Sequence, residues 1–213
     1  MTESRIPAAL VLGDGKVYRG YAFGAVERDS DIDPVYGEAV FTTGMTGYQE
    51  TMTDPSYHRQ IVVMTAPQIG NTGWNDEDNE SHDGRIWVAG LIVRDLSKRV
   101  SNWRAARSLE EEMRAQGIVG ISGIDTRSVV RHLRNEGSAP AGLFVGAASQ
   151  SDVQDLVAKV NAQPSMAGAD LSAQVSTDEA YTIAAKGEKR FTVVAYDMGI
   201  KTATPNHLSL IHI

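Results

Sequence analysis

The sequence predicts an α/β domain with a mixed sheet over about residues 6–147. Strand-like runs alternate with amphipathic helical segments along this range, which is the order found in sheets covered by helices. An Asp-Gly pair between two early apolar runs is a strong hairpin signal, and the continuous run Ile61–Thr65 is typical of a strand buried on both faces. Hairpins combined with a buried strand indicate a sheet with both antiparallel and parallel neighbours.

The first two strands are expected at 8–12 and 16–23, on either side of Gly13-Asp14-Gly15. The paired glycines could also suggest a nucleotide-binding loop, but that motif must open a helix, and here a β-pattern follows. A third strand, 37–42, leads into a polar segment and then into the buried run at 61–65.

The second half of the domain alternates strands with helices. A strand is expected at 86–93, including Trp87. Ser108 and Glu111 then form a capping-box pattern for a helix that ends at Gly117, since glycine tolerates the left-handed conformation past a helix end. Residues 118–121 return as a strand.

A second helix is expected at 126–136, with Asp125 as its N-cap and Gly137 at its end. Helical spacing turns one set of apolar residues inward, namely Val129, Val130 and Leu133. The opposite face carries three arginines, Arg127, Arg131 and Arg134. A last strand is expected at Phe144–Val145.

A helix followed by a linker is predicted over residues 148–190. Ser151 is expected to cap the helix, and the Ala-, Ser- and Gly-rich stretch after residue 162 carries one short strand near Tyr181. Residues 191–213 form a third region, which opens with an apolar, β-branched run at 191–196 that is typical of a buried parallel strand. Pro205 is expected to break any helix in the tail near its start.

Composition excludes several classes of function. The 213 residues carry a net charge of −7, which argues against non-specific binding to nucleic acid or to an anionic membrane. No apolar run is long enough to span a bilayer, and no secretory signal is apparent, so we expect a cytoplasmic protein. The chain has no cysteine, which excludes disulfides, thiolate zinc sites and a cysteine nucleophile within it. Its five histidines lack metal-ligand spacing except for one pair in the tail, so no metal site is predicted.

Two charged segments leave alternatives open. Residues 67–84 form a long loop with an acidic centre at 76–80. A calcium-binding loop needs a glycine at its sixth position and a glutamate at its twelfth, and this segment lacks both at the required spacing. A solvated loop near an interface is therefore favoured. Residues 96–107 are basic and contain Trp103, which favours a contact with a partner chain or a solvated face over a nucleic-acid site.

The segment 40–61 is the strongest candidate for function. Gly44, Gly47 and Pro55 punctuate it, and a short helical stretch follows Gly47. The Thr, Tyr, Gln, Asp, Ser and His side chains of the segment are expected to form a shaped polar surface. Asp54 and Ser56 flank the proline in a predicted tight turn, where their side chains can bond nearby backbone groups. Ordered polar loops often carry function, although most glycine-rich polar loops are only connections.

This segment closely resembles the small, glutamine-hydrolysing chain of carbamoyl-phosphate synthase. The resemblance rests on blocks that occur in register over about residues 6–202: Thr43–Glu50, Thr53–Tyr57, Ile69–Asn71, Gly90–Asp95, Ser101–Asn102 and Gly123–Arg127. It implies a layered β/β/α arrangement for residues 6–147. It also implies that 191–213 is the truncated start of a flavodoxin-like class I glutamine amidotransferase domain, of which 191–196 is the first strand.

The resemblance further implies a two-chain enzyme, a heterodimer. In that enzyme the small chain releases ammonia from glutamine and passes it to the large chain. The large chain uses ATP and magnesium to make carbamoyl phosphate from bicarbonate, for arginine and pyrimidine biosynthesis. No cofactor is expected on the small chain itself.

One departure limits what this chain can do alone. The family's C-terminal domain attacks glutamine with a cysteine, and the 213 residues contain none, so no residue here is assigned a catalytic role and the fragment alone is expected to be inactive. Its expected tasks are to dock on the large chain and to line the glutamine site. Ser56 matches a glutamine-contacting position of the family; the alternative for Ser56 is a turn residue that bonds its own backbone. The alternative for the whole chain is a non-catalytic protein-interaction module.

Overall fold

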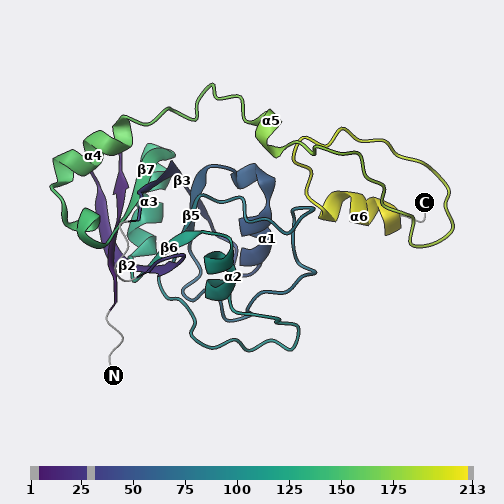
Figure 1. Ribbon diagram of the computed structural model, residues 1–213, viewed down its shortest axis with the longest axis horizontal. Helices are drawn as coiled ribbons and strands as arrows, with labels where there is room; N and C mark the ends of the chain where they lie inside the picture. The colour runs from purple at the N-terminus through teal and green to yellow at the C-terminus, as the bar shows by residue number, and fades with distance from the viewer. Residues whose placement is uncertain (1–4, 28–31, 211–213) are drawn as a thin grey trace.

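The computed structural model describes residues 5–27 and 32–210. The strands and helices follow one another in the order shown in Figure 1. They are β1 Pro7–Leu12, β2 Val17–Gly24, β3 Val35–Thr42, α1 Tyr48–Thr53, the 3-10 turn η1 Pro55–Tyr57, β4 Gln60–Met64, β5 Gly90–Ile92, α2 Leu109–Ala115, β6 Val119–Ser122, α3 Thr126–Glu136, β7 Ala139–Val145, the 3-10 turn η2 Gly146–Gln150, α4 Val153–Asn161, α5 Ser172–Val175 and α6 Ala203–Leu210.

The seven strands form one closed barrel in the order β1-β2-β6-β5-β4-β3-β7. The central pairs β3–β4, β4–β5 and β5–β6 are parallel, whereas β1–β2, β2–β6, β3–β7 and β1–β7 are antiparallel. The predicted mixed sheet is therefore confirmed. The two β layers of the expected β/β/α arrangement are not separate sheets, however. Strand β1 pairs with both β2 and β7 and so joins the two edges into one barrel. Closure leaves no unpaired edge strand to protect.

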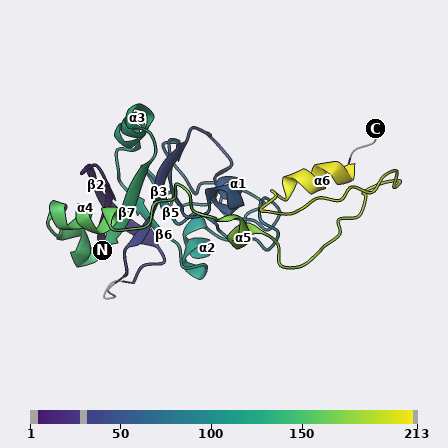
Figure 2. The same ribbon diagram turned by 90° about the horizontal axis from the view of Figure 1, so that it is seen from above.

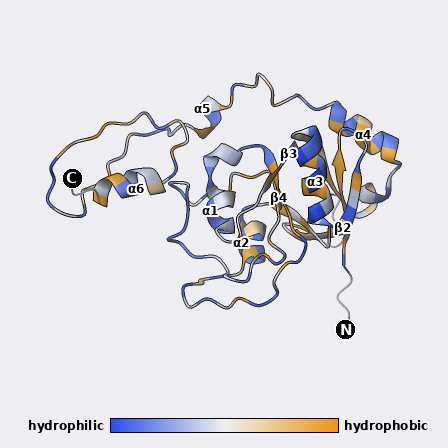
Figure 3. Cartoon of the chain, turned by 180° about the vertical axis from the view of Figure 1, so that it is seen from behind, coloured by the Kyte–Doolittle hydropathy of each residue, from blue (hydrophilic) through white to orange (hydrophobic). Residues whose placement is uncertain are grey.

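Alternate residues of the strands belong to different cores. Leu10, Ile61 and Leu143 belong to a cluster to which α3 contributes Val129 and Leu133. The opposite faces of β4 and β5 pack against α1, α2 and the long loops, and β1 and β7 pack against α4. Figure 3 shows the apolar colour concentrated on the strands, whereas α3 carries many hydrophilic residues.

Most local predictions are confirmed at their boundaries. Gly15, with φ 95°, completes the β1–β2 hairpin, and Ser108 and Glu111 form the predicted capping box of α2. Asp125 caps α3 by accepting a hydrogen bond from the Ser128 N–H, and the helix ends at Gly137. One cap is wrong by a residue: Asp152, not Ser151, accepts the capping bond of α4, from the Gln154 N–H at 2.8 Å.

Four predicted strands differ from the structure. Only Gly90–Ile92 of the expected 86–93 strand is in the sheet, and Trp87 precedes it. No strand forms near Tyr181, nor at 191–196, where Phe191, Val194 and Tyr196 are mostly exposed. These residues have no neighbouring strand within the described chain, so the backbone hydrogen bonds of a parallel strand are missing. The short β7 prediction was also wrong in length, since the strand begins at Ala139.

The tail contains a helix that the sequence did not predict. Pro205 lies in the first turn of α6, where the missing N–H of a proline costs no helical hydrogen bond. The prediction that Pro205 breaks this helix was therefore wrong. Figures 1 and 2 both place α6 and the residues before it at one end of the molecule, away from α3 and α4.

The two charged segments pair with each other. Arg104 binds Asp78, and Arg107 Nη1 lies 2.9 Å from Asp76 Oδ1 while its Nε donates to Glu112. Together the loops bury Trp74 completely, and an isolated bridge joins Trp74 to Arg107. The acidic loop is thus an ordered part of the fold, and its side chains Asp76 and Glu77 are solvated as expected, at 74% and 79% exposed. Arg104 and Arg107 are likewise engaged within the chain, although Trp103 is 91% exposed.

The described residues contain neither a membrane-spanning helix nor a metal-binding cluster. No helix there is long and apolar enough to cross a membrane, and no group of three or more acidic or histidine side chains is arranged to hold a metal ion.

Candidate functional site

The candidate site is built on α1 and the turn that follows it. Gly47 precedes α1 in the left-handed conformation, with φ 77°, which glycine adopts without strain. Tyr48, Gln49 and Thr53 are buried rather than displayed on a polar surface, which corrects the expectation from the sequence.

The buried polar groups of α1 hold the acidic loop in place. The Gln49 amide exchanges two hydrogen bonds with the Asn75 backbone, at 2.5 and 3.1 Å. Thr53 Oγ1 accepts from the Glu80 N–H at 2.8 Å, and the Tyr48 hydroxyl donates to the Gly73 carbonyl. Each of these bonds satisfies a buried polar group, so α1 and residues 73–80 form one unit.

The predicted tight turn follows at once. The buried carboxylate of Asp54 accepts a hydrogen bond from the Ser56 N–H at 2.9 Å, and Pro55 occupies the first position of η1. Ser56 itself is exposed, and within the described chain its hydroxyl makes no hydrogen bond. The turn is thus held by the side chain of Asp54, not by that of Ser56, and the Ser56 hydroxyl remains free to bind a ligand.

Residues 199–203 lie against this turn. Lys201 Nζ is 2.6 Å from Asp54 Oδ2, and a Cβ added to Gly199 would lie 3.2 Å from the Pro55 ring. The hydrogen bond to Asp54 raises the pKa of Lys201, with burial opposing it. The Thr202 and Ala203 N–H groups donate to Glu80, at 2.9 and 3.1 Å.

A second turn supports these contacts. Asp197 accepts from the N–H groups of Gly199 and Ile200, at 2.9 and 2.8 Å, and from the Tyr181 hydroxyl at 2.7 Å. Burial acts to raise the pKa of Asp197, but these hydrogen bonds outweigh it and the pKa is lowered. The hydrogen bond that Tyr181 donates to Asp197 raises the pKa of the Tyr181 hydroxyl to about 12. Tyr181 also stacks on His82, with ring centroids 4.3 Å apart.

The described residues near Ser56 provide binding groups but no nucleophile with its base. His58, the nearest histidine in sequence, accepts or donates a hydrogen bond with Gln174 at 2.9 Å and packs edge-on against Trp87. No hydrogen bond joins it to Ser56 among these residues. The arrangement can therefore orient a polar ligand, but on its own it lacks the paired groups of nucleophilic catalysis.

Sequence reasoning identified Ser56 and the turn around it. It missed the pairing of Lys201 with Asp54, because 147 positions separate the two residues and only the folded chain brings them together. The sequence pointed only to the local role of Asp54, because an aspartate directly before Pro-Ser is suited to accept a hydrogen bond within the turn.

Comparison with known proteins identifies a family. Residues 10–143 match the profile described as "Carbamoyl-phosphate synthase small chain, CPSase domain". The carbamoyl phosphate synthase small chain of Corynebacterium glutamicum is 67% identical over 204 residues, which are 96% of this chain and 50% of that protein. The small chains of Streptomyces coelicolor and Mycobacterium tuberculosis are 58% and 59% identical, over 96% and 95% of this chain and 52% and 53% of theirs. The chain thus spans about half the length of these relatives.

Proposed function

Since the chain belongs to the carbamoyl-phosphate synthase small-chain family, we propose that it forms the N-terminal half of a glutamine-hydrolysing subunit. The whole subunit would supply ammonia from glutamine for the ATP-dependent synthesis of carbamoyl phosphate from bicarbonate. That product would serve arginine and pyrimidine biosynthesis. In this proposal ATP and magnesium act on the large chain, and this half binds no cofactor of its own.

The observation that carries the proposal is the free hydroxyl of Ser56 on a turn held by Asp54. A hydroxyl on a fixed turn can bond the polar end of an amino acid at little entropic cost. Residues 197–203, which would directly follow the first strand of the family's second domain at 191–196, contact this same turn through Lys201 and Gly199. The second domain would therefore start next to Ser56, and the glutamine site would lie between the two halves.

The catalytic step would belong to the other half. In this family a cysteine thiolate attacks the glutamine amide, and these 213 residues contain no cysteine. The role of this half is then to bind and orient glutamine through Ser56 and to dock the subunit on the large chain.

A reconstitution experiment tests this function. The full-length small chain is produced with the large chain encoded beside it, and both copurification and glutamine-dependent carbamoyl phosphate synthesis are measured. We expect a complex that uses glutamine, whereas the 213-residue chain alone releases no ammonia above a heat-inactivated control. Ammonia release by the short chain would contradict the division of labour. Failure of the full-length chain to bind the large chain would favour the interaction-module alternative.

A further inference from the structure

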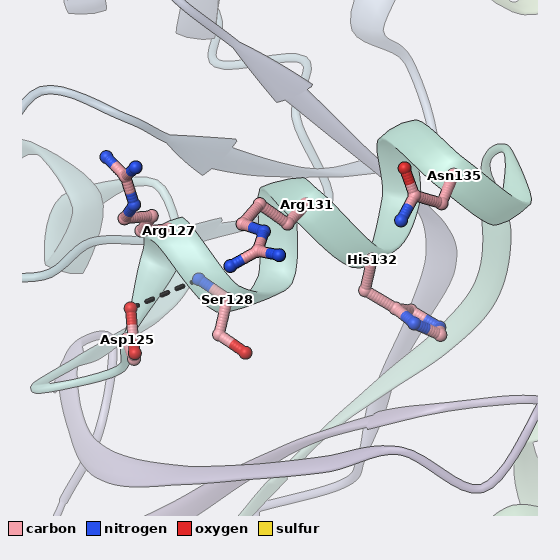
Figure 4. A pocket seen from close by; sticks show the side chains of 6 residues that line it. All are labelled: Asp125, Arg127, Ser128, Arg131, His132 and Asn135. Atoms are coloured by element: carbon pink, nitrogen blue, oxygen red, sulfur yellow. Dashed lines mark hydrogen bonds between the residues drawn. The ribbon is translucent and has the colours of Figure 1, made fainter.

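The outer face of α3 carries a row of arginines. Arg127, Arg131 and Arg134 are all exposed, and their spacing places them on one side of the helix. Val129 and Leu133 anchor the opposite side in the core of the barrel, so the arginine face cannot turn away from solvent. A groove of about 310 Å³ runs along this helix, and Figure 4 shows Arg127, Ser128, Arg131 and His132 among its lining residues.

These arginines differ from others in the chain. Arg104, Arg107 and Arg114 each pair with a carboxylate of the same chain. Within residues 5–27 and 32–210, no carboxylate lies within ion-pair distance of Arg127, Arg131 or Arg134. Arg94 and Arg99 likewise show no ion pair among the described residues, so what sets these three apart is that they share one exposed helix face on a chain of net charge −7.

The acidic groups beside the groove are already engaged. Asp125 caps α3 and accepts from the Ser128 N–H at 3.1 Å. Asp14, from the hairpin between β1 and β2, lies 2.5 Å from His132 Nε2. Neither carboxylate forms an ion pair with the arginine row, whose guanidinium groups remain available to anionic groups from outside.

The position of α3 indicates which partner fits. Figures 1 and 2 show the C-terminal segment and α6 at the other end of the molecule, where residues 199–203 contact Asp54 and Glu80. The second half of the subunit would continue from that end. The arginine face of α3 is thus left for a different chain.

We propose that the arginine face of α3, formed by Arg127, Arg131 and Arg134, docks an acidic segment of the large chain. Arginine is suited to this role because its planar guanidinium binds carboxylates through two parallel hydrogen bonds. The inference rests on the proposed function, which supplies the large chain as the partner, and adds the surface and the chemistry of the contact.

The test compares two charge reversals of equal size in the full-length small chain. One variant is Arg127→Glu with Arg131→Glu. The matched control is Lys186→Glu with Lys189→Glu, which changes two exposed residues of the linker by the same charge. The affinity for the large chain is measured at low and at high salt, and circular dichroism establishes that each variant is folded. We expect the α3 variant to bind at least about 10-fold more weakly, with a smaller salt dependence, and the control to bind nearly as the wild type does.

The outcomes separate this inference from the proposed function. If the wild-type chain does not bind the large chain, the proposed function fails. If the wild type binds and the α3 variant binds equally well, only the docking surface is wrong. If the variant weakens glutamine use while large-chain affinity is unchanged, the second half of the subunit covers α3, and the proposal is overturned.

A conservative variant provides an independent readout should the reversals not fold. Arg131→Lys keeps the positive charge and introduces an amine that a carbodiimide couples directly to a carboxylate. Mass spectrometry of the treated complex should find a cross-link from position 131 to an aspartate or glutamate of the large chain. Cross-links from 131 only to residues of the small chain would contradict the proposal.

Discussion

Lys201 Nζ lies 2.6 Å from Asp54 Oδ2, while Oδ1 of the same carboxylate accepts the Ser56 N–H at 2.9 Å. The side chain of Asp54 is only 3% exposed, whereas that of Lys201 is half exposed. One buried carboxylate thus links the turn that presents Ser56 to the segment that follows Asp197. A substitution in the Ser56 turn should therefore affect the segment around Lys201, and a substitution at Lys201 should affect the turn.

Replacing Lys201 with glutamine should loosen residues 199–203. The change removes the charge partner of a buried carboxylate, and solvent screening around the half-exposed lysine limits the loss to about 1–2 kcal/mol. The amide hydrogens of Thr202 and Ala203, which bond to Glu80, should then exchange roughly 5- to 30-fold faster. Lys186→Gln, an exposed change in the linker, is the control. Equal exchange rates in the two variants would show that the pair does not hold the segment.

Lowering the pH should also loosen residues 199–203, because it protonates Asp197, which accepts hydrogen bonds from the Gly199 and Ile200 N–H groups. The pKa of Asp197 is lowered from its ordinary value of 3.8, so its stabilisation is present above pH 3.8 and is lost as pH falls through the folded-state pKa below that value. Protection of the Gly199 and Ile200 amides should disappear over this range. Tyr181→Phe removes one hydrogen bond that lowers the pKa and should move the midpoint upward. A midpoint that is the same with and without the Tyr181 hydroxyl would count against this network.

Ser56→Ala in the full-length small chain should raise the glutamine KM by about 2- to 12-fold, with kcat little changed. This range corresponds to the loss of one hydrogen bond worth roughly 0.5–1.5 kcal/mol that is made equally in the ground and transition states. Stability should not change, because Asp54 and not the Ser56 hydroxyl holds the turn. Ser101→Ala, an exposed serine in another loop, serves as the control. A KM equal to that of the control would return Ser56 to the role of a turn residue.

Arg107 should matter for stability far more than Arg114. Glu112 is buried, and Arg107→Gln would leave its carboxylate without a counter-charge, at a cost of about 3 kcal/mol in the free energy of unfolding. Arg114→Gln breaks only a surface pair with Glu110 one helical turn away, which is worth about 0.3–0.5 kcal/mol. Urea unfolding of the two variants measures both values. Similar losses would mean that the pairing of the two charged loops contributes little.

The sequence was most informative where structure is set by neighbours along the chain. The capping box at Ser108 and Glu111, the cap at Asp125 and the Gly15 turn each depend on residues within a few positions, and all three are present. The polar segment 40–61 was located correctly, yet Tyr48, Gln49 and Thr53 were wrongly expected at the surface. Tyr48 and Gln49 are buried because the loop 73–80 folds over them, and no local pattern announces that contact.

Ion pairs between segments far apart in the chain were the other feature that could not be predicted from the sequence. An acidic stretch at 76–80 and a basic one at 98–107 each resemble a solvated or partner-facing segment when considered alone. Only the fold shows that Asp76 and Asp78 meet Arg107 and Arg104. The same is true of barrel closure, since β1 and β7 are more than 120 residues apart in the chain.

The exposed run 191–196 provides the sharpest test of the proposed second half. Phe191, Val194 and Tyr196 are 76–91% exposed, although their sequence is that of a buried parallel strand. Ordering a strand costs about 1–2 kcal/mol per residue in backbone entropy, and here no neighbouring strand or covering helix offsets that cost. Trypsin should therefore cut the 213-residue chain after Lys186, Lys189 or Arg190, and chymotrypsin after Phe191 or Tyr196, leaving a stable barrel.

In the full-length chain the bonds after Phe191 and Tyr196 should resist chymotrypsin, because a second domain would place 191–196 inside its own sheet. Mass spectrometry of timed digests gives the cut sites and their rates in the two proteins. Rapid cutting after Phe191 and Tyr196 in both proteins would mean that this run is a linker rather than the first strand of a domain. Slow cutting in both would mean that residues 191–196 are held by the barrel itself, and the assignment of 191–213 to a separate domain would then be wrong.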